Sequence, residues 1–304
     1  MSGPLPSSTW GYALPDLLIF PFKGDYPVSQ ANEKTIERIG KILLIFKASE
    51  GEIRPHFWLT GPSGSGKSFN IMDQCNRLDI MLPMTEVNCA SLTKEGYSGL
   101  SLSKALAPLA TLGNVPNVVF CDEMDKLFLS GNSNDSHANE ISIGVQNEFL
   151  RVLEGSTTQT FGDYGKYNTV SVERSLFIFA GAFNGQENMD STELLKCGVK
   201  TEFIGRTGLV YNLEKPTLEA LVQYLKESEL WANYRSLFPK EDHKKAEKWL
   251  IKEIGRQYPD SNIGVRLINT LIHQYYINAG EDSKPQSGKK EFARTLDFST
   301  GRLK

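Results

Sequence analysis

The chain has 304 residues, of which 40% are hydrophobic and 23% are charged, and its formal net charge is −3. These values fit a globular protein of one or two domains and exclude a disordered or collagen-like chain. The longest apolar stretch, 175–183, is shorter than the roughly 18 residues of a membrane helix, and the small negative charge gives no bulk attraction to nucleic acid or anionic lipid.

Apolar periodicity predicts alternating strands and helices over the first two thirds of the chain. In chain order, the pattern predicts an extended arm at 1–20, a helix at 32–47, a strand at 57–60, a helix at 67–78, strands at 85–89 and 117–121, a helix at 145–153 and a strand at 175–182. The strands are apolar on both faces, which is typical of a parallel sheet covered by helices on both sides. The predicted fold class is therefore α/β.

The pattern changes after Tyr211, where amphipathic helices follow one another without a convincing strand. These helices are predicted at 216–226, 241–258 and 264–279. We therefore expect four parts: an N-terminal arm at 1–20, a large domain at 21–213, a smaller helical lid domain at 214–280 and a mobile C-terminal tail at 281–304.

Cysteine and histidine usage bears on the compartment and on metals. The four cysteines and four histidines are scattered, and no C-x-x-C pair is present. This pattern favours a reduced, cytoplasmic protein without a structural metal, and no secretory signal is expected at the N-terminus.

A glycine-rich segment separates the predicted strand at 57–60 from the helix that follows. It matches the phosphate-binding pattern G-x-x-x-x-G-K-[ST] through Gly61, Pro62, Ser63, Gly64, Ser65, Gly66, Lys67 and Ser68, with Phe69 next in the helix. Glycines let several backbone N–H groups face one anion, and the helix N-terminus adds its dipole. ATP is the expected ligand, with Lys67 reaching its β- and γ-phosphates and Ser68 holding Mg²⁺.

An acidic pair ends the apolar strand predicted at 117–121. Asp122 and Glu123 follow Val118-Val119-Phe120-Cys121, and Asp122 lies 55 residues after Lys67. In a nucleotide hydrolase, Asp122 would hold Mg²⁺ directly or through water. Glu123 would polarise the attacking water as a general base.

A short aromatic segment lies between these two motifs, and with it the chain resembles the ClpX/HslU branch of the ring-forming AAA+ ATPases. In that family a Gly-Tyr-aliphatic-Gly loop lines the central pore and its aromatic ring grips a polypeptide. The corresponding residues here are Gly96, Tyr97, Ser98 and Gly99, with Ser98 standing where the family usually has Val.

Further stretches resemble the same family in the same order. Residues 145–155 look like the helix after the second pore loop, which places that loop near 134–140. Residues 176–183 look like the sensor-1 strand, with Asn184 as the nearest polar candidate, and 25–30 look like the adenine-side segment that includes Val28. Residues 202–206 look like the segment of the arginine finger, Arg206, and 263–266 look like the sensor-2 start, Arg266.

The resemblance implies a subunit-interface ATPase. Arg206 would reach into the neighbouring subunit's site, whereas Arg266 would approach the phosphates of its own subunit. The expected assembly is a homo-oligomeric ring of six that unfolds or remodels a protein partner. No zinc-binding segment precedes the motor and no Ile-Gly-Phe tripeptide lies between Ala182 and Glu202, so we expect no partner peptidase.

Two other functions stay open at this point. The first is a nucleic-acid-associated AAA+ ATPase such as a helicase loader, whose phosphate contacts would come from Lys94, Lys104, Lys284, Lys289, Lys290 and Arg294. The net charge and the aromatic loop argue against a nucleic-acid partner. The second is a regulatory switch that hydrolyses ATP slowly, against which the complete set of Asp122, Glu123 and Arg206 argues.

Overall fold

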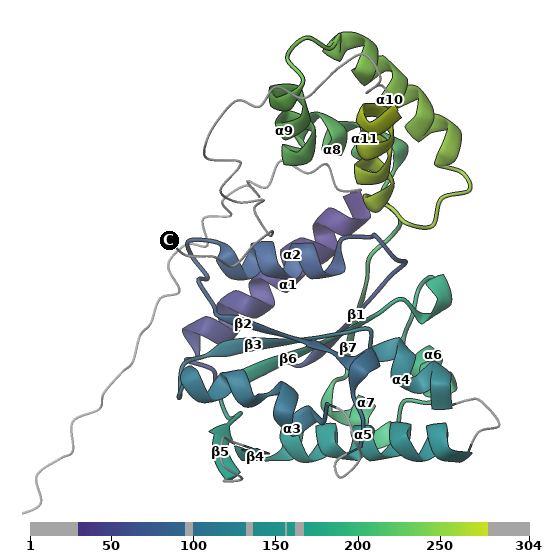
Figure 1. The fold of residues 1–304 in the computed structure, drawn as a ribbon. Coiled ribbons are helices and arrows are strands. Elements are labelled where there is room, and N and C mark those ends of the chain that lie inside the picture. Colours follow the sequence, from purple (N-terminus) through teal and green to yellow (C-terminus); the bar gives the residue numbers. More distant parts are fainter. Residues whose placement is uncertain (1–29, 95–99, 132–135, 156, 162–166, 279–304) are drawn as a thin grey trace, which may run out of the picture.

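The computed structural model describes residues 30–94, 100–131, 136–155, 157–161 and 167–278. Its centre is a five-stranded sheet in the order β2-β3-β6-β1-β7, in which every pairing is parallel (Figure 1). The strands are β1 (Phe57–Thr60), β2 (Met84–Asn88), β3 (Asn117–Asp122), β6 (Ser175–Gly181) and β7 (Leu209–Asn212). The predicted α/β class is confirmed.

Helices cover both faces of this sheet (Figure 1). Helices α1 (Gln30–Ala48) and α2 (Lys67–Asn76) lie on one face. The other face is covered by α3 (Leu102–Ala105), α4 (Met124–Gly131), α5 (Ser136–Glu154), α6 (Ser191–Lys196) and α7 (Thr201–Arg206). Short 3₁₀ turns span Cys89–Ser91, Ala107–Thr111 and Phe183–Gly185.

The apolar runs of the central strands are explained by this two-sided covering. In β3, Val118 and Phe120 belong to the core formed with α1 and α2, whereas Val119 and Cys121 belong to the core on the opposite face. Successive side chains of a strand point to opposite faces, so a strand buried on both sides has no polar alternation.

An aromatic cluster joins α5 and α7 to the sheet. The Trp58 ring lies 5.2 Å from that of Phe179 and 5.5 Å from that of Phe203, measured between centroids. Trp58 Nε1 donates a 2.7 Å hydrogen bond to Thr207 Oγ1, and both residues are fully buried. Thr207, the residue that follows Arg206, is thereby fixed to β1.

A separate two-stranded antiparallel sheet consists of β4 (Thr157–Phe161) and β5 (Tyr167–Ser171). It follows α5 and lies at the edge of the large domain beside α3 (Figure 1). This hairpin was not predicted.

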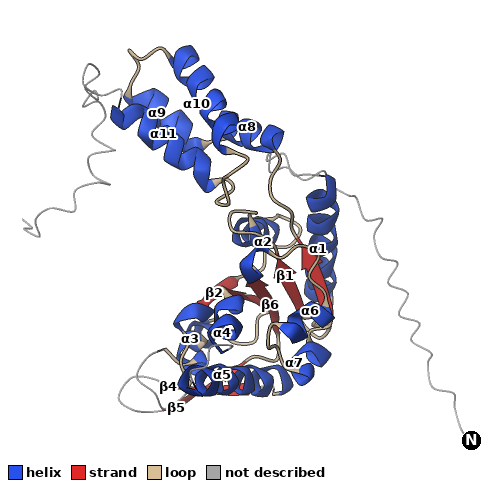
Figure 2. Cartoon of the chain, turned by 90° about the vertical axis from the view of Figure 1, so that its right-hand side faces the viewer, coloured by secondary structure: helices blue, strands red, loops and turns tan. Residues whose placement is uncertain are grey.

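Four helices form the second domain: α8 (Leu218–Glu227), α9 (Glu229–Leu237), α10 (His243–Gln257) and α11 (Arg266–Asn278). Figures 1 and 2 both place them apart from the sheet. They have their own core, which includes Leu225, Trp231, Leu250 and Ile268. Within the part of the chain that the structure describes, no helix has both the length and the apolar character needed to cross a membrane.

The linker between the domains is attached to α1 by side-chain hydrogen bonds. Asn32 Nδ2 donates to Glu214 O at 3.1 Å, and Glu214 N donates to Asn32 Oδ1 at 2.7 Å. Thr35 Oγ1 donates to Asn212 O at 3.3 Å, while the Asn212 side chain pairs with both backbone groups of Met189. The chain is therefore held from the end of β7 to residue 214.

The predicted strands at 57–60, 85–89, 117–121 and 175–182 are each confirmed to within one residue. The strands β4, β5 and β7 and the helices α3, α4, α6, α7 and α9 were missed. One expectation is corrected: α5 begins at Ser136, so residues 136–140 of the expected second pore loop are helical, and 134–135 lie outside the described residues.

Candidate active site

The glycine-rich loop lies at the carboxyl end of β1, and its glycines have the backbone conformations that it requires. Gly61, Gly64 and Gly66 have φ values of 146°, 73° and 88°, which side chains disfavour. A Cβ at Gly61 would also lie 2.3 Å from Leu213 O. The loop therefore curls directly against the start of the domain linker.

Lys67, the first residue of α2, points back over this loop. Its Nζ donates to Gly61 O at 2.7 Å and to Pro62 O at 3.0 Å. Burial lowers the pKa of Lys67 and Arg266 acts in the same direction, whereas Asp122 and Asp125 raise this pKa. The amine is thus enclosed in the loop, where a bound phosphate would meet it.

The next residue brings the two motifs together. Ser68 Oγ donates to Asp122 Oδ2 at 3.0 Å, and Asp122 Oδ1 accepts from Glu123 N at 2.8 Å. Glu123 has φ of 57°, an unfavourable conformation for a residue other than glycine that often marks a functional position.

This pair of oxygens fits Mg²⁺. A hydroxyl and a carboxylate are hard oxygen ligands, and Mg²⁺ usually takes one or two protein ligands and completes its shell with phosphate and water oxygens. In the described ranges, no group of three or more His, Cys, Asp or Glu side chains is arranged to hold a metal. Ser68 and Asp122 are thus the residues that would hold a Mg²⁺ ion beside a bound phosphate.

A cavity of about 360 Å³ encloses these groups. Its walls come from the loop, from the start of α2, from the ends of β3 and β6 and from the start of α11. The lining residues include Lys67, Ser68, Phe69, Asp122, Glu123, Asp125, Gly181 and Arg266. The structure therefore brings the phosphate-binding loop, the acidic pair and Arg266, the sensor-2 candidate, to one place.

The small domain reaches this cavity through a backbone contact between two glycines. A Cβ at Gly264, where φ is 53°, would lie 2.2 Å from Gly64 O, and a Cβ at Gly64 would lie 2.1 Å from Ile263 O. Val265 N donates to Gly64 O at 3.5 Å. Only glycines permit this approach, which brings Arg266 to the cavity.

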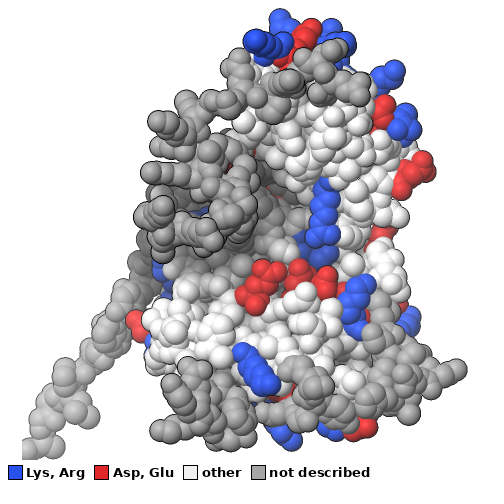
Figure 3. Space-filling view, in the orientation of Figure 1, with Lys and Arg blue, Asp and Glu red and all other residues white. Residues whose placement is uncertain are grey.

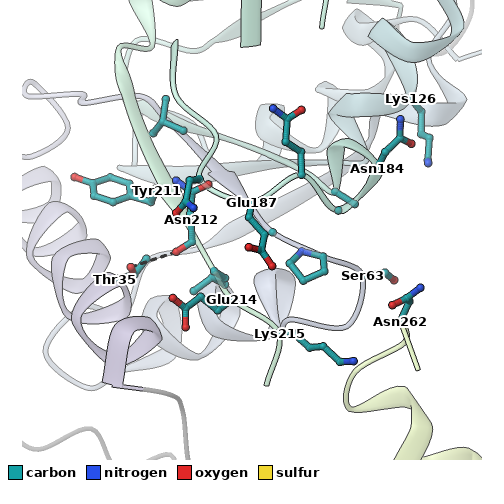
Figure 4. Close-up of a pocket in the computed structure, with 18 of the residues that line it drawn as sticks. Thr35, Ser63, Lys126, Asn184, Glu187, Tyr211, Asn212, Glu214, Lys215 and Asn262 are labelled. Atoms are coloured by element: carbon teal, nitrogen blue, oxygen red, sulfur yellow. Dashed lines mark hydrogen bonds between the residues drawn. The ribbon is translucent and has the colours of Figure 1, made fainter. Parts of the chain in front are cut away.

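A larger cavity of about 850 Å³ lies beside the first and shares Ser63, Lys126 and Ala182 with it. Figure 4 shows side chains from α1, from the β7 end and from the loop after β6 around this space, among them Thr35, Asn212 and Asn184. It continues the site along the loop toward the domain linker.

The sensor-1 candidate lies in this larger cavity. Asn184 sits three residues past the end of β6, in a 3₁₀ turn with φ of 56°, and it does not line the smaller cavity. The proposed role of Asn184 as the sensor-1 residue therefore stays a prediction.

Asp125 is a site residue that the sequence reasoning missed. Its side chain is 2% exposed, and its Oδ1 accepts from Ala182 N at 3.2 Å. Oδ2 lies 3.4 Å from Lys126 Nζ and, among the described residues, has no hydrogen-bond partner. Asp125 thus joins the acidic motif to the end of β6, through a contact between distant segments that no short sequence pattern signals.

Arg206 lies outside both cavities. It ends α7, its side chain is 40% exposed, and its Nη2 donates to Glu154 Oε1. Val28 and the segment 96–99 with Tyr97 lie outside the described residues.

Charge is mixed on the face shown in Figure 3. Asp and Glu side chains of the described residues gather across its middle, and Lys and Arg side chains lie beside and above them. The Lys and Arg side chains of the described residues seen on this face form no single extended basic surface of the kind that tracks a nucleic-acid backbone.

Comparisons with known proteins agree with these motifs. Residues 57–203 match the family "ATPase family associated with various cellular activities (AAA)". The chain is 32% identical over 214 residues to "ATP-dependent Clp protease ATP-binding subunit ClpX 2" of Wolinella succinogenes, covering 59% of this chain and 53% of the relative. It is 23% identical over 280 residues to "ATP-dependent Clp protease ATP-binding subunit ClpX" of Treponema denticola, covering 77% and 67%. The chain thus spans between about half and two thirds of these curated relatives.

Proposed function

Because this chain is an AAA+ ATPase similar to ClpX, we propose that it hydrolyses ATP in the smaller cavity and uses the reaction to unfold or remodel a protein partner. The observation that carries the proposal is the convergence of Lys67, Ser68, Asp122, Glu123 and Arg266 on one cavity. These residues come from two motifs and two domains, and together they supply the groups needed for phosphoryl transfer to water.

Each group has a defined task in this proposal. Lys67 and the loop N–H groups bind the phosphates, and Glu123 orients the attacking water and takes its proton. Ser68 and Asp122 hold Mg²⁺, which when bound neutralises charge on the phosphate oxygens. Arg266 contacts the phosphates from the small domain, so that a change in the nucleotide changes the domain contact at Gly264.

The proposed assembly is a homo-oligomeric ring, with six members as in the expectation from the sequence. Arg206 lies away from the cavities of its own chain and its side chain is 40% exposed, which supports a role in the neighbouring subunit's site. An arginine supplied in trans is worth about 10³–10⁵ in rate in other nucleotide hydrolases.

The proposed substrate is a polypeptide gripped by Tyr97, and we propose that the motor acts without a peptidase. Support for the latter is the lack of an Ile-Gly-Phe tripeptide between Ala182 and Glu202. The cytoplasm is the proposed place of action, in keeping with four cysteines that form no disulfide.

The decisive experiment uses the Glu123→Gln variant of the full chain. Its ATPase kcat should fall by about 10²–10⁴ while ATP binding persists, because only the general base is lost. Glu173→Gln is the matched control, since Glu173 is exposed in the turn between β5 and β6 and its variant should keep wild-type kcat. Full ATPase activity of the Glu123 variant would refute the assigned role.

Coupling to a polypeptide is tested separately with Tyr97→Ala. This variant should hydrolyse ATP normally. It should fail to retain the polypeptide partner that the ATP-trapped Glu123→Gln protein retains after crosslinking in lysate. A nucleic-acid motor would instead show DNA binding that falls steeply with salt. Sedimentation at saturating ATP tests the ring, and a persistent monomer would end the proposal.

A further inference from the structure

Helix α7, which ends at Arg206, is attached to α5 at its start, middle and end. At its start, the Gln146 carboxamide makes two hydrogen bonds to the backbone of the turn before α7, one with a carbonyl and one with an N–H. Gln146 Nε2 donates to Gly198 O at 3.2 Å, and Lys200 N donates to Gln146 Oε1 at 3.1 Å. Gln146 is 2% exposed, and Lys200 is the N-cap residue of α7. The buried amide therefore fixes where α7 begins.

The middle of α7 is fixed by stacked rings. Phe149 of α5 and Phe203 of α7 are both fully buried, their centroids are 5.9 Å apart, and their planes meet at 21°. Phe203 also lies edge-on to Phe179 of the sheet, at 5.0 Å. This contact sets the distance and rotation of α7 relative to α5.

The end of α7 is fixed by the ion pair between Arg206 and Glu154, the last residue of α5. The two side chains are 40% and 50% exposed, so solvent screens the pair and its strength is small. One N–H of the guanidinium is used by Glu154, and Arg has five such donors. The pair can therefore orient Arg206 while leaving donors for another group.

Helix α7 has six residues, which is too short to be stable by itself because isolated helices need roughly 12–15 residues. Its geometry must come from its contacts with α5 and the sheet. From the pattern of these contacts we propose that Gln146 and Glu154 are positioning residues that aim Arg206 at the ATP site of the neighbouring subunit. This inference rests on the proposed role of Arg206 in trans.

The first test measures ATPase activity of two single variants. Glu154→Gln keeps the size of the side chain and removes its charge, so the fold should persist while kcat falls about three- to tenfold with the KM for ATP unchanged. Gln146→Ala should lower kcat more, because α7 loses the amide that fixes its start. Glu253→Gln is the control, since Glu253 forms an ion pair with Arg256 within α10 of the small domain, and its kcat should equal that of the wild type.

A second test separates positioning of Arg206 from a general structural role. In an Arg206→Ala background, Glu154→Gln should have no further effect on kcat, because the group that it orients is gone. A fall by the same factor in both backgrounds would overturn the inference, as would wild-type kcat for both single variants.

Mixed rings locate the effect in one subunit. Arg206→Ala and Glu123→Gln subunits, each strongly impaired alone, should restore activity when mixed, because the second lends Arg206 to the intact site of the first. Glu154→Gln added to the Glu123→Gln chain should lower this activity about three- to tenfold, whereas adding it to the Arg206→Ala chain should not. Equal effects in both chains would overturn the inference. Wild-type kcat for Arg206→Ala alone would instead refute the proposed role of Arg206.

Discussion

A single substitution can test the Gly64–Gly264 contact between the phosphate-binding loop and the small domain. In a Gly264→Ala variant the added Cβ would lie 2.2 Å from Gly64 O, well inside the 3.4–4 Å of an ordinary contact. The backbones would have to separate by roughly 1 Å. Arg266 lies two residues farther along the chain and would move with them.

The expected magnitude follows from the backbone conformation. Gly264 has φ of 53°, and a residue with a side chain pays about 1–2 kcal/mol for the left-handed region. Since 1.4 kcal/mol is a factor of ten in an equilibrium, the arrangement with this contact should become about tenfold less populated. We expect kcat/KM for ATP to fall by about that factor if the contact brings Arg266 to the phosphates.

Steady-state ATPase assays measure kcat/KM for ATP, and thermal unfolding measures the stability of the small domain. Gly255→Ala is the matched control, because Gly255 lies within α10 and a Cβ there meets no atom within 4 Å. That substitution should stabilise the small domain by about 0.5–1 kcal/mol and leave kcat/KM unchanged. Wild-type kcat/KM for Gly264→Ala would show that the contact has no part in the reaction.

Three further predictions concern buried polar groups. Trp58→Phe removes the donor to Thr207 and should lower the free energy of unfolding by about 1–3 kcal/mol in denaturant titration; an unchanged value would contradict the bond. Asp125→Ala leaves the Ala182 N–H without its acceptor and should lower stability and ATPase kcat, whereas Asp125→Asn, which keeps an acceptor oxygen, should restore stability. Burial lowers the pKa of His56 from 6.5 to about 4. Between these pH values the imidazole is therefore protonated in the unfolded chain and neutral in the native chain. The free energy of unfolding should therefore fall by about 3 kcal/mol between pH 6.5 and 4, and His56→Ala should reduce that slope.

The strands β1, β3 and β6 of the central sheet could be predicted because they are buried on both faces. The runs at 57–60, 117–121 and 175–182 are almost wholly apolar, and few other structures bury such short runs completely. Strand β7 was missed because its four residues are partly exposed at the sheet edge, and α9 because only Ser228, its N-cap, separates it from α8. The Ser228 cap was the signal that could have identified it.

The site residues likewise divide into those that the sequence predicted and those that it missed. Lys67 and Ser68 could be predicted from the spacing of the motif after β1, and Asp122 and Glu123 from their place at the end of β3. The role of Asp125 depends on how closely β6 approaches α4, and sequence alone carries no such distance. The contacts of Gln146 with the turn before α7 join residues more than fifty positions apart, so no short motif could reveal them.

The hydrogen bonds of Asn32 and Thr35 with the linker limit how the two domains can rotate. Because the chain is held to α1 up to residue 214 and Thr217 already caps α8, any pivot must lie at 215–217. Pro216 restricts one torsion of that short span. Rotation of the small domain would therefore be confined to a narrow range of directions, and inserting even one residue there should weaken the coupling between the phosphate-binding loop and the small domain.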